Sequence, residues 1–154
     1  MLIAALLSTL HLFALAIGLS GVVIRWRELR RLVTDPAALE PMFVGDNLWG
    51  VAAILWLVTG LLRAFGTFEK GSGYYLNNHA FLLKLGLFGA IFLLELWPMV
   101  TFIVWRIRKA KGLPLDTSRA ATFATITGVE VVLTVAIPFV ASMMARGIGF
   151  TWFS

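Results

Sequence analysis

The stretch HAFLLKLGLFGAIFLLELWPMVTFIVW, residues 79–105, decides the fold because its only charged side chains are Lys84 and Glu95. About 20 predominantly apolar residues are enough for a helix to cross a bilayer, and this run is longer. Three more apolar runs, residues 2–24, 46–65 and 120–144, have the same character. The sequence therefore predicts an all-α integral membrane protein, a four-helix bundle in a single domain spanning residues 1–154.

The composition agrees with this fold class. Of the 154 residues, 60% are hydrophobic and 14% are charged, against ~45–50% and ~25% in soluble domains. This balance excludes a soluble enzyme, a disordered chain and a coiled coil. Cysteine is absent, which excludes disulfide scaffolds, iron–sulfur clusters, Cys-ligated zinc and thiol nucleophiles. Although the net charge is +5, the basic residues lie between the apolar runs, so the expected partner is the lipid bilayer and not nucleic acid.

The same basic residues predict the orientation of the chain. The connections between the first and second runs and between the third and fourth contain Arg25, Arg27, Arg30, Arg31, Arg106, Arg108, Lys109, Lys111 and Arg119. The other side has only Arg63, Lys70 and Arg146. Because Lys and Arg accumulate in cytoplasmic loops, both termini are expected outside a bacterial inner membrane that the chain crosses several times. Asp46 or Asn47 is interpreted as the cap of the second helix. Small residues at Ala14/Gly18 and Gly86/Ala90 predict close helix packing.

Few ionisable residues fall inside the runs, and each is a candidate for function because charge is costly in a membrane. They are His11, Lys84, Glu95 and Glu130, with Arg63 and His79 at helix ends. With a rise of ~1.5 Å per residue, His11, Glu95 and Glu130 are expected in a central layer. Arg63, Lys84 and His79 form a second layer nearer the outside, beside Tyr74 and Tyr75. At least one of the two glutamates is expected to be protonated.

Four interpretations of these residues remain open. His11 could ligate a haem iron, with His79 or Lys84 as second ligand and the cationic layer, Arg63 and Lys84, holding the propionates. His11, Glu95 and Glu130 could instead bind a transition metal, or relay protons. Alternatively, all three could be structural, hydrogen-bonded between helices. No catalytic residue is indicated.

Several motifs resemble a bacterial family of predicted four-span membrane proteins of unknown function, the domain-of-unknown-function 2214 type. They are GLLR at 60–63, EKG at 69–71, YYLNN at 74–78, KLGLF at 84–88, Pro98 with FIVWR at 102–106, and MARGIG at 144–149. The likeness covers most of the chain. It implies the four-span topology but no activity.

A more distant similarity, to copper-resistance-D and HemJ-type membrane proteins, concerns His11 and Lys84-Leu85. Those families share a histidine in the first helix and a Lys-Leu near the start of the third. The HemJ-type resemblance implies binding of haem b. However, the segment after His11 lacks the Leu-Phe-Tyr-Leu-Pro-Arg run of that oxidase, so its enzyme activity is not carried over.

The function predicted from the sequence is therefore a b-type haem-binding membrane protein with an electron-transfer or oxidase-like role. Two alternatives are a non-catalytic structural or assembly subunit of a membrane complex and a small proton or ion pathway. A membrane-protein partner or a second copy of the chain is compatible with each of them.

Overall fold

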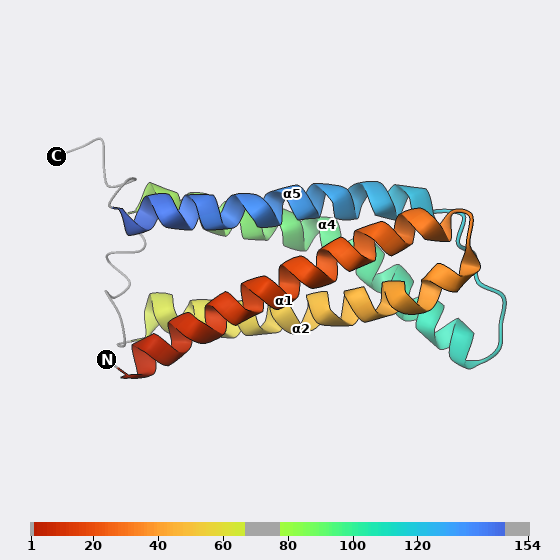
Figure 1. The fold of residues 1–154 in the computed structure, drawn as a ribbon, viewed down its shortest axis with the longest axis horizontal. Coiled ribbons are helices and arrows are strands. Elements are labelled where there is room, and N and C mark those ends of the chain that lie inside the picture. Colours follow the sequence, from red (N-terminus) through yellow and green to blue (C-terminus); the bar gives the residue numbers. More distant parts are fainter. Residues whose placement is uncertain (1, 67–77, 147–154) are drawn as a thin grey trace.

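The computed structural model describes residues 2–66 and 78–146. This part of the chain consists of four long helices, α1 (Leu2–Leu32), α2 (Leu39–Phe65), α4 (His79–Ala110) and α5 (Ala120–Ala145), and a short 3-10 helix, η1 (Pro36–Ala38). Successive long helices run in opposite directions, so α1 begins and α5 ends at the same end of the bundle (Figure 1). All four are long and apolar enough to cross a membrane. The predicted all-α fold is confirmed.

The first connection is much shorter than the sequence predicted. Helix α1 does not stop before Arg25 but continues to Leu32, and α2 begins at Leu39 instead of residue 46. The expectation was wrong because a charged residue at the edge of an apolar run does not by itself end a helix. The turn itself is built by Asp35, whose side chain accepts a hydrogen bond from the Ala37 N–H (2.9 Å), and by Pro36 at the first position of η1.

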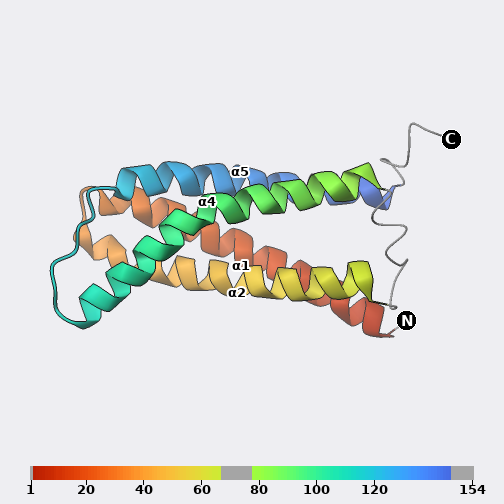
Figure 2. The same cartoon turned by 180° about the vertical axis from the view of Figure 1, so that it is seen from behind.

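Helix α4 begins where the sequence predicted and ends later. The Asn78 side chain caps its start by accepting hydrogen bonds from the Ala80 and Phe81 N–H groups. The helix continues past residue 105 to Ala110. Figure 2 shows that α4 changes direction partway along its length, and Pro98, which cannot donate a backbone hydrogen bond, lies inside it. Helix α5 matches its predicted range to within one residue.

The helices pack in two pairs, α1 with α2 and α4 with α5, and α1 also packs against α5 (Figures 1 and 2). Helices α1 and α2 approach each other closely at Gly21 and Gly45. A Cβ atom added at Gly45 would lie 2.6 Å from the Arg25 backbone nitrogen. Close packing is confirmed at Gly18, where an added Cβ would lie 3.0 Å from the Ala52 Cβ. At Gly86 the predicted close packing is wrong, because an added Cβ atom would have no other atom within 4 Å.

Aromatic rings fill the interior of the bundle. Phe102 and Trp105 of α4 contact Phe123 of α5, with ring centroids 5.5 and 6.0 Å from that of Phe123. Trp49 and Trp56 of α2 form a second group with their centroids 6.5 Å apart. Many large aliphatic and aromatic side chains instead lie on the outside of the helices, among them Leu12, Ile54, Leu93, Val132 and Phe139. This exposed apolar surface contacts the lipid bilayer.

Candidate functional site

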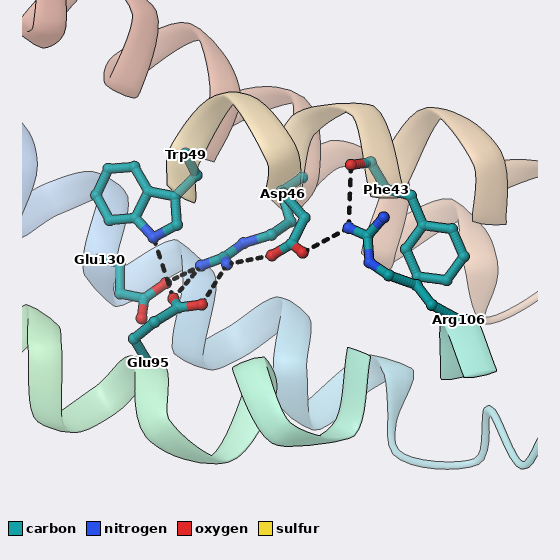
Figure 3. A network of polar contacts seen from close by, with 7 residues as sticks. Phe43, Asp46, Trp49, Glu95, Arg106 and Glu130 are labelled. Carbon is teal, nitrogen blue, oxygen red and sulfur yellow. Dashed lines mark hydrogen bonds and ion pairs between the residues drawn. The ribbon is translucent and has the colours of Figure 1, made fainter. Parts of the chain in front are cut away.

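Arg25 of α1 is a charged side chain with no exposed surface. Its guanidinium donates hydrogen bonds to carboxylates from all three other long helices (Figure 3). Nη1 lies 3.0 Å from Oδ1 of Asp46 and 2.7 Å from Oε1 of Glu95. Nη2 lies 2.7 Å from Oε2 of Glu95 and 2.5 Å from Oε2 of Glu130. Arg25 therefore ties α1 to α2, α4 and α5 at one level.

The cluster extends from Asp46 to a second guanidinium. Arg106 of α4 donates to Oδ2 of Asp46 (2.7 Å) and to the Phe43 carbonyl oxygen (3.3 Å). Its guanidinium also lies over the Phe43 ring, 4.2 Å from the centroid. On the other side, the Trp49 indole N–H donates to Oε2 of Glu95 at 3.1 Å. We call Arg25, Asp46, Glu95, Arg106 and Glu130 the Arg25 cluster.

Two atoms within the Arg25 cluster remain without a hydrogen-bond partner among the described residues. They are Nε of Arg25 and Oε1 of Glu130, and both are fully buried. The hydroxyl groups of Thr127 and Thr134, which flank Glu130 on α5, are buried and unpartnered in the same way. Buried polar atoms of this kind are usual sites for internal water.

This geometry corrects four sequence-based expectations. Glu95 and Glu130 do lie together, but His11 is not with them, so the predicted central layer is wrong. Within the described residues, no three His, Asp or Glu side chains form a metal-ligand group. Asp46 lies inside α2 and does not cap it. Arg25, assigned to a loop, is instead the centre of the cluster. The sequence did contain a signal that Asp46 forms an ion pair. If the helix continues past a charged residue beside an apolar run, that residue needs a partner of opposite charge.

His11 lies nearer the beginning of α1, in a separate environment. Its Nδ1 is 2.7 Å from the hydroxyl oxygen of Thr59 on α2. That hydroxyl donates in turn to the Leu55 carbonyl oxygen at 2.6 Å. Since the one hydroxyl proton is used there, Thr59 accepts from His11 Nδ1–H. The neutral imidazole then carries its lone pair on Nε2. The Trp56 indole N–H donates to the His11 carbonyl oxygen at 3.2 Å.

A cleft opens beside this imidazole, and we call it the His11 cleft. It has a volume of about 360 Å³, within the ~300–1,000 Å³ typical of small-molecule sites. His11, Arg63 and Lys84 all line it. Its apolar walls include Trp56, Phe81, Ile137 and Pro138, and a smaller adjoining pocket that also reaches His11 is lined by Leu61 and Phe88. Gly60 leaves room next to the ring, since an added Cβ would lie 3.6 Å from the His11 Cε1.

Two residues of the predicted cationic layer, Arg63 and Lys84, line the same cleft as His11. His79, the other expected histidine, starts α4 and is not among the residues lining the cleft. Lys70, Tyr74 and Tyr75 lie outside the described residues. Sequence reasoning missed Thr59, and a hydroxyl in an otherwise apolar run was the signal that could have found it.

Comparison with known proteins identifies the family. Residues 3–149 match the family model described as predicted membrane protein (DUF2214). Because the match covers nearly the whole chain, this protein belongs to that family. No curated protein and no solved structure was found to match.

Proposed function

We propose that this protein binds b-type haem in the His11 cleft, with His11 as an axial ligand of the iron. The observation that carries the proposal is the hydrogen-bonded chain from His11 Nδ1 through the Thr59 hydroxyl to the Leu55 carbonyl. Metal-binding histidines usually donate their second ring N–H to such a partner, which fixes the tautomer and orients the ring. The imidazole is therefore prepared to ligate through Nε2.

The remaining lining of the cleft suits the other parts of the tetrapyrrole. Haem has an apolar ring and two anionic propionates. Trp56, Phe81 and Pro138 supply apolar walls, while Arg63 and Lys84 supply cations for the propionates. Lys84 lines the cleft and His79 does not, so Lys84 is the better situated second ligand; in that role it would bind as a neutral amine and leave Arg63 as the cation for the propionates. When bound, haem would supply one-electron chemistry, consistent with an electron-transfer component.

The visible spectrum of the purified protein tests this proposal. Protein from haem-sufficient cells is expected to show a Soret band, and His11→Ala is expected to abolish it because the iron loses its axial nitrogen. His79→Ala is the matched control, since it removes a histidine outside the cleft, and it is expected to retain the band. Thr59→Val is expected to weaken haem retention. A colourless protein that also takes up no added haemin would refute haem binding.

A second candidate function, a structural subunit of a membrane complex, is favoured by the Arg25 cluster. The Arg25 guanidinium joins all four long helices, and Arg25 is not among the residues that line the His11 cleft. This role requires no cofactor. A colourless wild-type protein that co-purifies with a fixed set of membrane proteins would support it over haem binding.

We further propose that the His11 cleft faces the outside of a bacterial inner membrane and the connection at 111–119 faces the cytoplasm. The distribution of Lys and Arg supports this orientation. A cysteine at position 72, which lies outside the described residues, is expected to react with an impermeant thiol reagent in intact cells. A cysteine replacing Ser118 is expected to react only after lysis. The native chain contains no cysteine to interfere, and the reverse labelling pattern would invert the orientation.

A further inference from the structure

The charges of the Arg25 cluster do not balance. The cluster contains two guanidinium groups, from Arg25 and Arg106, and three carboxyl groups. Arginine stays protonated in proteins, so full ionisation would leave one negative charge uncompensated among apolar side chains. An uncompensated charge in such surroundings is costly, and a carboxylate avoids the cost by binding a proton. One carboxyl group of the cluster is therefore expected to be neutral.

Hydrogen bonding identifies Glu130 as the carboxyl group that holds this proton. Both oxygens of Asp46 accept from a guanidinium. Both oxygens of Glu95 accept from Arg25, and one of them also accepts from Trp49. Glu130 accepts through Oε2 alone, and its Oε1 has no partner among the described residues. Its side chain is also fully buried, whereas Asp46 and Glu95 are 18% and 16% exposed. The groups facing Glu130 are Arg25 of α1 and Glu95 of α4, with Asp46 of α2 beyond Arg25.

Polar atoms continue from Glu130 along one face of α5. Thr127 and Thr134 lie three residues before and four residues after it, spacings that return to the same helix face. A helical threonine commonly donates to the carbonyl four residues earlier, as Thr125 does to Ala121. Thr127 and Thr134 do not, although both are fully buried. About one turn beyond Thr134 is Ile137, which lines the His11 cleft.

We propose that the Arg25 cluster is a proton-binding site inside the membrane, in which Glu130 carries one exchangeable proton that passes between the cluster and the His11 cleft beside Thr134. Internal water bound at the unpartnered hydroxyl of Thr134 and at Oε1 of Glu130 completes the route. The Arg25 guanidinium remains charged and holds the carboxyl groups in place. This site requires no haem, and its test does not depend on haem binding.

Infrared spectroscopy of the protein in liposomes tests the charge count. At neutral pH the wild type is expected to show the C=O band of one carboxylic acid, and Glu130→Gln is expected to remove it. Glu95→Gln is expected to remove the same band without altering Glu130, because two guanidiniums then match two carboxylates. Arg106→Gln, which removes a cation, is expected to double the intensity of the C=O band because a second carboxyl group would then be neutral. Glu28→Gln is the matched control, because Glu28 is buried but paired with Arg27 and Arg31, and it should leave the band unchanged.

Either of two results would overturn the proton site: a wild type without an acid band, or a band that survives both Glu130→Gln and Glu95→Gln. The second of these variants keeps the test decisive if Glu130→Gln does not fold. A large loss of folding in Glu130→Gln alongside an absent acid band would indicate three ionised carboxylates and contradict the proposal.

The route is tested by the rate at which the acid band shifts after transfer into D₂O. Thr134→Val removes the hydroxyl with little change in shape and is expected to slow the shift at least about tenfold, roughly the effect of a 1.4 kcal/mol barrier. Thr134→Ser should exchange at the wild-type rate. Thr125→Val, on the exposed face of α5, is the control and should have no effect. An unchanged rate in Thr134→Val would refute passage beside Thr134.

Discussion

Replacing Arg25 with leucine is expected to lower the free energy of unfolding by about 3–5 kcal/mol, the usual cost of removing one partner from a buried ion pair. The leucine would leave Asp46, Glu95 and Glu130 without their shared guanidinium. The packing of that guanidinium over the Trp49 and Phe102 rings would also be lost. Titration with a denaturing detergent in mixed micelles, followed by tryptophan fluorescence, measures the change.

The control for this variant is Arg27→Leu. Arg27 is 72% exposed and pairs only with Glu28 in the described structure, so its loss is expected to cost less than about 1 kcal/mol. Combining Arg25→Leu with Glu95→Gln should recover stability, because Asp46 keeps its ion pair with Arg106 and neutral groups can replace the rest of the buried ionic cluster at little cost. If Arg25→Leu alone were as stable as the wild type, the cluster would not be what holds the four helices together.

Hydropathy alone was sufficient to predict the number of helices and their membrane-spanning character, since a run such as 79–105 allows few other folds. It could not predict the ends of α1 and α2. Arg25 and Asp46 look like boundary residues because each stands at the edge of an apolar run. They become interior residues only because they pair with each other across the two helices, and a single sequence does not reveal such pairing.

The candidate sites were also predicted only in part from the single sequence. Depth along each helix correctly placed Glu95 and Glu130 at one level, because residue number translates directly into height in a bundle. The predicted depth of His11 was wrong because it was measured from Arg25. Counting inward from Arg25 as though it stood at the membrane edge moved His11 too near the centre. Its true neighbours, Thr59 and Gly60, depend on how α1 and α2 cross, and that crossing is determined by glycines.

Gly45→Ala is expected to destabilise the protein by about 1–3 kcal/mol or more, the range for overpacking a tight interior. The added Cβ would lie 2.6 Å from the Arg25 backbone nitrogen and 2.8 Å from the Gly21 carbonyl oxygen. Both are backbone atoms of α1, so no side-chain rotation can relieve the contact. The two helices must separate, and the Arg25 guanidinium moves with α1 away from Asp46.

Gly50→Ala is the matched control on the same helix. An added Cβ at Gly50 meets nothing within 4 Å, and alanine favours a helix over glycine by up to about 1 kcal/mol. The same detergent titration should therefore find Gly50→Ala at least as stable as the wild type. If Gly45→Ala proved equally harmless, α1 and α2 could separate without cost. The Gly21–Gly45 contact would then not be what positions Arg25 opposite its carboxylates.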